Sequence, residues 1–432
     1  MRFLSRKHGV TALATAATLL WLPTTSGAQA LAQPSRPSSA LTLQQALQMA
    51  ETANAALRAK RAQTAAADGA QLDANALLAS NPQLSLDFAR RSVSPSGLPA
   101  QRNGEWGAGL SQAFETGGQR SYRRDAASAS LAALRAEIED TRRVLRTEVA
   151  TRFYRVLALQ QRVALEAQSV RLFDETAAAV QKRRVAGEDT KLDANITVVE
   201  AERARNQLAA TEEQLNDART ELATQLQLSP PTLPVAEGTL ELLKPRYTLA
   251  QLQEQVVLQP RLSALEAREN SALARLKLEQ ANIAPDVTVG LSVGRQGPSD
   301  SREITTMLSV SVPLPLFKRN ALGIGQARTD LSQVQIDRQA ATRDTNAQVQ
   351  SLWARLSSLE SRVRRLQDTV LPTLADNQQL SIKSQRAGQI GLLELIVVSR
   401  QSLDARRDLN EALSDYHATR LSLERAAGWT QE

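Results

Sequence analysis

The stretch Val149–Val170, VATRFYRVLALQQRVALEAQSV, returns about 200 residues later as Val349–Val370, VQSLWARLSSLESRVRRLQDTV. Apolar residues and two arginines keep their phase in the two copies, in the pairs Val149/Val349, Phe153/Trp353, Arg155/Arg355, Val156/Leu356, Leu159/Leu359, Arg162/Arg362, Val163/Val363 and Val170/Val370. The chain therefore contains one structural unit twice.

The repeat extends on both sides of this stretch. Upstream, Leu110-Ser111 corresponds to Val310-Ser311, and downstream the segment RVAG (184–187) corresponds to QRAG (385–388). We expect each half to contain a strand pair, a long helix, a tight turn and a returning helix. The first repeat covers 31–228 and the second 248–432, and a proline-rich linker at 229–247 separates them.

The long helices are predicted at 119–186 and 321–387. In the second, the apolar residues alternate steps of three and four, as in a heptad seam, whereas Arg152 and Glu166 interrupt the seam of the first. Each helix would be roughly 100 Å long at 1.5 Å per residue. Pro372 should kink the second or remove one backbone hydrogen bond. Shorter helices at 43–79, 190–228, 249–283 and 391–427 would pack along these two.

The N-terminus has the features of a signal peptide, expected at 1–30. Basic residues precede the apolar stretch Val10–Leu22, and Ala28-Gln29-Ala30 places small residues where a signal peptidase cleaves; cleavage after Ala32 is the alternative. An uncleaved anchor helix is disfavoured because the apolar stretch is shorter than the roughly 20 residues that a span needs. The mature chain is expected to be exported.

The composition argues against several classes of protein. The absence of cysteine excludes disulfides, thiolate sites and a lipid-modified cysteine. The formal charge is +7, but Lys and Arg alternate with Asp and Glu, so no basic face predicts nucleic-acid binding. His417 is the only histidine beyond the signal peptide, which leaves no triad or transition-metal cluster. We expect no enzyme activity, cofactor or resident metal, and a solvated or seam position for His417.

Four segments of about ten residues alternate apolar and polar side chains, at 82–91, 104–114, 285–296 and 303–312. That length crosses a bilayer at a tilt, and the alternation is typical of an outer-membrane barrel, with a small soluble sheet as the alternative. The smallest membrane barrels need eight strands, so several protomers must contribute, and three would supply twelve.

Several motifs in this order carry a resemblance to a known family. They are Asn81-Pro82, LSQAFETGGQR (110–120), RVAGE (184–188), Pro313 with Pro315 and Phe317, Arg386-Ala387-Gly388, and LLEL (392–395). The mature chain resembles the TolC-type outer membrane efflux proteins, and within them the outer membrane components of cobalt-zinc-cadmium-type heavy-metal pumps. The resemblance implies a mainly α fold with a small membrane β part. A trimer would join a twelve-stranded barrel in outer-membrane lipid to a helical tunnel in the periplasm.

The resemblance also implies partners and sites. The partners would be a periplasmic adaptor and an inner membrane pump of the resistance-nodulation-division type. The adaptor would dock on the two turns, formed by Arg184, Ala186 and Gly187 and by Arg386, Ala387 and Gly388. The small glycine tips suit helix packing, because glycine takes a positive φ at a helix end; an ordinary helix end without a partner is the alternative.

Acidic residues just past the turns line a periplasmic constriction in this family. Asp193 and Glu394 occupy the matching positions, with carboxylates on a solvated helix face as the alternative. A tyrosine and an arginine that help to close some relatives are replaced by Gln385 and Ile390. The favoured function is a passive efflux duct for heavy-metal cations or drugs. The alternatives are a duct for type I protein secretion and a soluble periplasmic coiled-coil scaffold or adaptor.

Overall fold

The computed structural model describes residues 40–93, 101–297 and 302–429. The chain divides into two units, Met1–Pro37 and Ser38–Glu432, and the described residues all belong to the second. The expected signal peptide with both cleavage positions, and the connection at 94–100 inside the first strand pair, lie outside the described residues.

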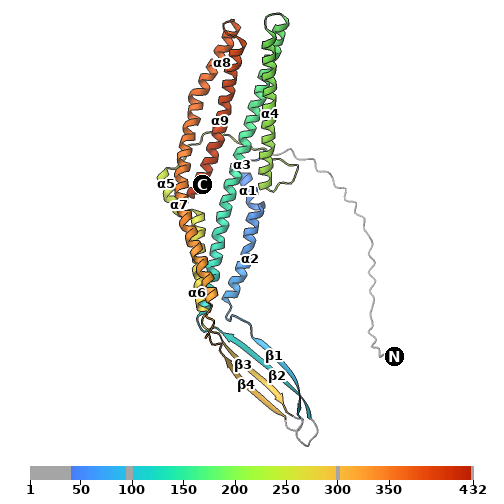
Figure 1. Cartoon of the computed structure of the whole chain (residues 1–432), viewed down its shortest axis with the longest axis vertical. Helices are drawn as coiled ribbons and strands as arrows, with labels where there is room; N and C mark the ends of the chain where they lie inside the picture. The colour runs from blue at the N-terminus through green and yellow to red at the C-terminus, as the bar shows by residue number, and fades with distance from the viewer. Residues whose placement is uncertain (1–39, 94–100, 298–301, 430–432) are drawn as a thin grey trace, which may run out of the picture. The chain divides into compact units, whose positions relative to one another are not determined.

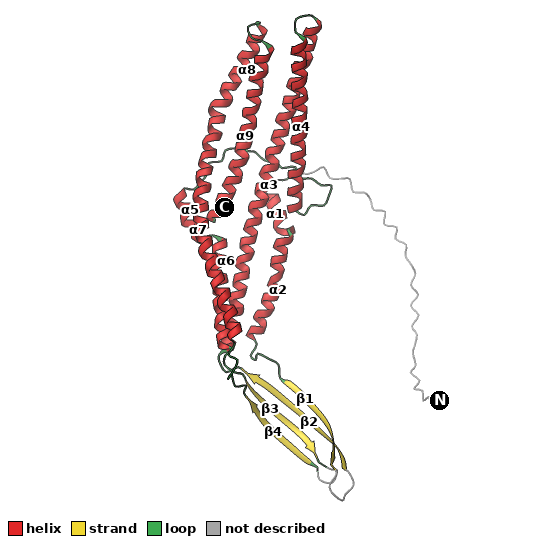
Figure 2. Cartoon of the chain, viewed as in Figure 1, coloured by secondary structure: helices red, strands yellow, loops and turns green. Residues whose placement is uncertain are grey.

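The described elements are nearly all helical, and four strands form a single sheet (Figure 2). The first repeat contains α1 (Leu43–Ala53), α2 (Ala55–Asn75), β1 (Gln83–Val93), β2 (Gln101–Phe114), α3 (Gln119–Val185) and α4 (Lys191–Gln225). The second contains α5 (Leu249–Gln255), η1 (Val256–Leu258), α6 (Pro260–Ala281), β3 (Val287–Gln296), β4 (Glu303–Ser311), α7 (Ala321–Arg365), η2 (Leu366–Val370), α8 (Leu371–Arg386) and α9 (Leu392–Ala427). The predicted fold class, mainly helical with four strands, is confirmed.

The two long helices differ in continuity. Helix α3 is unbroken over 67 residues. In the second repeat, α7, η2 and α8 follow one another without a loop, and η2 is a wider π-helical turn just before Pro372. Pro372 lacks an N–H, and its ring would clash with the carbonyl of residue 368 in a regular helix. The local widening lets the helix continue past the proline.

The helices expected at 43–79 and 249–283 were wrongly predicted as unbroken. Asn54 ends α1 and caps α2, because its side chain accepts a hydrogen bond of 3.2 Å from the Leu57 N–H, and α2 already ends at Asn75. Gln259 is extended because it precedes Pro260, and it separates η1 from α6. An asparagine cap and a residue before proline were the missed signals.

Short helices pack in series along each long helix (Figure 1). Helices α1, α2 and α4 contact α3, while α5, α6 and α9 contact α7. The two repeats also share contacts, since α3 packs against both α6 and α9. Val149 and Val156 of α3 lie in the same buried core as Val363 of α7 and Ala412 of α9. The apolar seams of the two repeats therefore pack together in shared hydrophobic cores.

The linker at 229–247 is fastened to these helices. The Gln160 side chain donates to the Ala236 carbonyl and accepts from its N–H, both at 2.9 Å. The Tyr416 hydroxyl donates to the Leu243 carbonyl at 2.5 Å. His417 is fully buried, with Nε2 at 2.9 Å from the Glu241 carbonyl and its ring stacked on Tyr154 at 4.3 Å. His417 is therefore a seam residue, one of the two positions expected for it.

The sheet has the order β1-β2-β3-β4 and is antiparallel throughout. The central pair, β2 with β3, joins the two repeats. Strands β1 and β4 form its two edges. In the described part of the chain, no helix combines the length and apolar character needed to cross a membrane.

Candidate functional site

One face of the sheet carries in-register apolar rows. Leu84, Leu110, Leu291 and Leu308 are successive cross-strand partners, and each is more than half exposed. Cross-strand partners point to the same side of a sheet. Two further rows on this side are Leu86/Ala108/Val293/Thr306 and Phe88/Trp106/Arg295/Ile304. The face is thus predominantly apolar, with Thr306 and Arg295 as the polar members of these three rows.

The opposite face is made of small and polar residues. Its rows are Gln83/Ser111/Gly290/Ser309, Ser85/Gly109/Ser292/Met307 and Asp87/Gly107/Gly294/Thr305. A membrane barrel has such a polar inner face and an apolar band against lipid. Leu308 and Val289 lie on the apolar side of the sheet, because Leu308 belongs to the leucine row and Val289 is the cross-strand partner of Val310.

Each helical hairpin ends in the same backbone turn. Gly187 has φ 84° and Gly388 φ 73°, the positive values expected for a glycine helix end. The Glu188 N–H donates to the Arg183 carbonyl at 2.9 Å, and the Gln389 N–H donates to the Ser384 carbonyl at 2.8 Å. A Cβ built on either glycine meets no atom within 4 Å. The two tips are therefore alike, exposed and open.

Side-chain hydrogen bonds hold the first turn in place. The Arg183 guanidinium donates from Nε and Nη2 to the two carboxylate oxygens of Asp189, at 2.7 and 3.0 Å. This pairing raises the pKa of Arg183. Thr190 caps α4, and Asp193 completes a capping box with it. The Arg183–Asp189 pair was not among the predicted site residues, although the opposite charges flanking the predicted turn indicate it.

Asp193 is held close to the first turn. The Thr190 hydroxyl donates to its carboxylate at 2.6 Å and the Thr190 N–H at 3.2 Å. These hydrogen bonds, with the hydroxyl contributing most, lower the pKa of Asp193 below its usual value. The carboxylate is thus ionised and hydrogen-bonded at the N-terminal end of α4.

The second turn has no corresponding fastening among the described side chains. Gln385 and Ile390 are partly buried, Ala387 is exposed, and the Arg386 side chain lies outside the described positions. Gly391 starts α9 without a side-chain cap, and Glu394 in its first turn is exposed. Arg184 is partly buried and Ala186 exposed in the first turn. The structure brings each set of turn residues together within its own hairpin.

Farther from the tips, ion pairs tie the two hairpins together. Glu166 of α3 is fully buried and accepts from Arg407 of α9 at 2.8 and 2.5 Å. Glu200 of α4 accepts from Arg400 Nε at 2.7 Å. Glu166 is therefore a paired charge at the contact of α3 with α9, which the sequence pattern indicated only as an interrupted seam.

A sheet with one apolar and one polar face, joined to long helical hairpins, defines the class of outer membrane channels with a periplasmic helical part. Comparison with known families agrees, since the family model described as outer membrane efflux protein matches residues 36–226 and 252–429. The chain belongs to this family.

Individual relatives cover most of the chain. It is 25% identical over 397 residues to the cobalt-zinc-cadmium resistance protein CzcC of Cupriavidus metallidurans, covering 91% of this chain and 92% of that protein. It is 26% identical over 422 residues to the pyoverdine export outer membrane protein OpmQ of Pseudomonas putida, covering 93% and 87%.

A solved structure shares the fold. The outer membrane protein VceC of Vibrio cholerae has a TM-score of 0.74 at 18% identity, covering 89% of this chain and 96% of that chain. The predictions of a TolC-type fold, an outer membrane location and a role as an efflux channel are confirmed. Its family and structural neighbours are channels.

Proposed function

We propose that three copies of the chain close a twelve-stranded barrel and form a passive exit duct for heavy-metal cations. The carrying observation is the leucine row Leu84/Leu110/Leu291/Leu308, which gives the sheet an apolar face while β1 and β4 are left as edges. Open sheet edges are not tolerated in hydrocarbon, because backbone groups there have no water to bond. Pairing β4 of one copy with β1 of the next removes every edge.

The proposed partners are a periplasmic adaptor and an inner membrane pump of the resistance-nodulation-division type. The adaptor would dock on the two tips, at Arg184, Ala186 and Gly187 and at Arg386, Ala387 and Gly388. The exposure of both glycines and the free space around them support this role. A passive duct has no energy source of its own, so export against a gradient requires such a pump.

The proposed constriction comprises Asp193, Glu394, Gln385 and Ile390, repeated three times around the axis. The exposure of Glu394 and the lowered pKa of Asp193 support a ring of negative charge at the narrow end. A carboxylate ring attracts hydrated cations. The similarity to a cobalt-zinc-cadmium resistance protein supports metal cations as the substrate class.

A deletion strain tests this function. We expect it to become sensitive to zinc, cobalt or cadmium and to regain resistance when the intact gene is supplied. The matched control is the same gene carrying Leu308→Arg, which should not restore resistance if export needs the barrel. Unchanged tolerance of all three metals, together with lost export of a siderophore or a secreted protein, would reject the metal substrate but retain the duct.

A further inference from the structure

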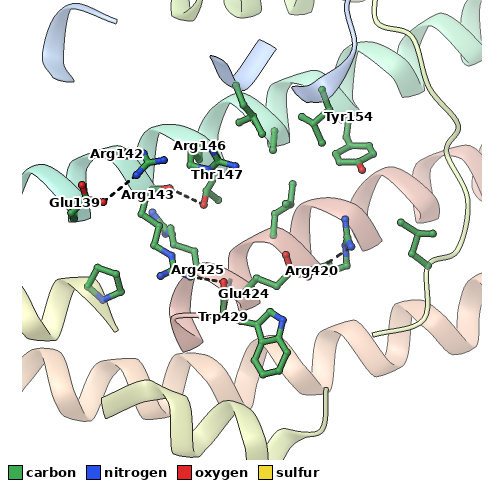
Figure 3. A pocket seen from close by; sticks show the side chains of 16 residues that line it. Glu139, Arg142, Arg143, Arg146, Thr147, Tyr154, Arg420, Glu424, Arg425 and Trp429 are labelled. Carbon is green, nitrogen blue, oxygen red and sulfur yellow. Dashed lines mark hydrogen bonds and ion pairs between the residues drawn. The ribbon is translucent and has the colours of Figure 1, made fainter. Parts of the chain in front are cut away.

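A cavity of about 500 Å³ lies between α1, α3 and α9, where the two repeats meet (Figure 3). Only two acidic side chains line it, Glu139 and Glu424. Five arginines line it as well, namely Arg142, Arg143 and Arg146 of α3 and Arg420 and Arg425 of α9. The lining is therefore dominated by guanidinium groups from both repeats.

Arg420 is the most buried of these arginines, and one of its hydrogen-bond donors is unused. Its side chain is 9% exposed, and its Nη1 lies 3.8 Å from Glu424. Its Nε has no hydrogen-bond partner among the described residues. Buried polar groups in folded proteins nearly always have a partner, so a donor left open beside a cavity points to a ligand acceptor.

The α3 arginines differ in how far they are neutralised. Arg142 and Arg146 both pair with Glu51. Arg143 instead donates to the Trp429 backbone carbonyl. Burial and then repulsion from Arg146 lower the pKa of Arg143, although Asp140 and Glu424 act in the opposite direction. The positive charge at Arg143 is therefore incompletely compensated.

Apart from Thr147, the rest of the lining is mainly apolar. Leu43, Leu47, Tyr154, Leu243 and Trp429 contribute to it. Sites for small organic molecules have volumes of roughly 300–1,000 Å³ and combine apolar walls with a few placed polar groups. The volume of this cavity lies within that range, and its lining is divided into a cationic part and an apolar part.

We propose that the cavity binds a small soluble organic anion, with a phosphate or carboxylate group facing Arg143 and Arg420 and an apolar body facing Trp429. Arginine suits either group because its planar donors match two oxygens at once. A bilayer lipid does not fit, since 23 residues from Gln119 to Arg142 place the cavity roughly 35 Å along α3 from the sheet. The bound anion would join α3 of the first repeat to α9 of the second.

Titration of the purified trimer tests the site, with phenyl phosphate as the probe and calorimetry and intrinsic tryptophan fluorescence as readouts. We expect saturable binding, with benzoate also binding and inorganic phosphate competing weakly because it lacks the apolar body. Arg143→Gln and Arg420→Gln should each weaken binding about tenfold or more. The matched control is Arg171→Gln, an exposed arginine of α3 outside the cavity, which should bind as the unmodified protein does.

A structural readout separates loss of the site from loss of the fold. Phenyl phosphate should raise the unfolding temperature of the unmodified trimer and of Arg171→Gln, and should raise that of Arg143→Gln much less at the same concentration. Because Arg420 is buried, Arg143→Lys serves as a second variant that keeps the charge and should bind with intermediate affinity. The proposal is overturned if the unmodified trimer shows no saturable binding up to about 10 mM probe, or if Arg143→Gln binds unchanged.

Discussion

The turn between α3 and α4 and the turn between α8 and α9 have the same backbone conformation but different side chains. Both end on a glycine with positive φ and on the same pair of backbone hydrogen bonds. Among the described side chains, the first turn alone has an ion pair, Arg183–Asp189, and a side-chain cap, Thr190. The corresponding positions in the second turn are Ser384, Ile390 and Gly391. The two repeats therefore share the backbone feature that closes a hairpin and differ in the side-chain contacts that stiffen it.

The sheet shows the opposite outcome of the same duplication. Leu110 of β2 and its repeat equivalent Val310 of β4 lie on the apolar face, where Leu308 is in the same row as Leu110. Ser111 and its equivalent Ser311 lie on the other face. In the proposed barrel both halves face lipid on one side and water on the other, so both keep the same alternation of apolar and polar residues. The halves should therefore respond equally to substitutions in the sheet and unequally to substitutions at the turns.

The largest effect is expected in the sheet. Leu110→Arg and Leu308→Arg each place a charge on the apolar face, which costs about 2–4 kcal/mol at the middle of the bilayer. We expect both to reduce the yield of heat-resistant trimers in outer membrane fractions, and to similar extents. Ser111→Arg and Ser309→Arg are the matched controls on the polar face and should insert. Normal yield from the leucine variants would disprove the assignment of the faces.

A smaller but still large effect is expected at the two glycines. Gly187→Val and Gly388→Val each force a β-branched residue to a positive φ, a strain of about 1–3 kcal/mol. We expect trimers to persist in the membrane while metal resistance is lost. Gly→Asn at the same positions is the control, because asparagine tolerates this conformation and the structure leaves room for its side chain.

The asparagine variants distinguish two reasons why the turns would require glycine. If they support export, the turns require only the positive φ. If they fail as the valine variants do, the adaptor requires a tip without a side chain. Full export by Gly388→Val would show that the adaptor does not contact the second turn.

Much of this architecture follows from local pattern. The heptad spacing around Val349 predicted a long helix, and the alternation around Leu308 predicted which side chains share a face, because both periods are properties of a single segment. The break at Asn54 was missed although asparagine is a strong helix cap.

Long-range pairings could not be predicted in the same way. Glu166 interrupts the α3 seam in the sequence, and its partner Arg407 belongs to the other repeat. Only the packing of α3 against α9 brings the two charges together. The proposed constriction is less predictable still, since the distance of Asp193 and Glu394 from a symmetry axis would depend on copies of the chain rather than on its own contacts.

A moderate effect is expected from removing the first turn's ion pair. Arg183→Gln should cost about 0.5–1 kcal/mol, because the arginine is partly exposed and such pairs are screened by solvent. We expect faster amide hydrogen exchange around the first turn and no change at the second. The reverse experiment, Ser384→Arg with Ile390→Asp, builds the pair into the second turn and should slow exchange there. Equal exchange at both turns in the unmodified protein would remove the proposed difference in stiffness.

The smallest expected effect concerns the acids beyond the turns. Asp193→Asn with Glu394→Gln removes the charge while keeping side-chain size, so trimer stability should be preserved. We expect lower cation selectivity in planar bilayers, because like charges around a narrow opening favour cations. The single variants compare the two repeats. Glu394→Gln should have the larger effect, because Glu394 is exposed whereas the Asp193 carboxylate accepts a hydrogen bond from Thr190.

The pH dependence should distinguish the same two acids. Hydrogen bonds from Thr190 lower the pKa of Asp193 below its usual 3.8 in the folded protein. The cap that Asp193 provides is therefore fully present above that value and is lost as pH falls through the lowered pKa. Selectivity due to Asp193 should accordingly persist to lower pH in the unmodified channel than in Thr190→Ala, which lacks both the hydroxyl donor and the cap.

Selectivity that is unchanged in the double variant at neutral pH would place both carboxylates outside the conduction path.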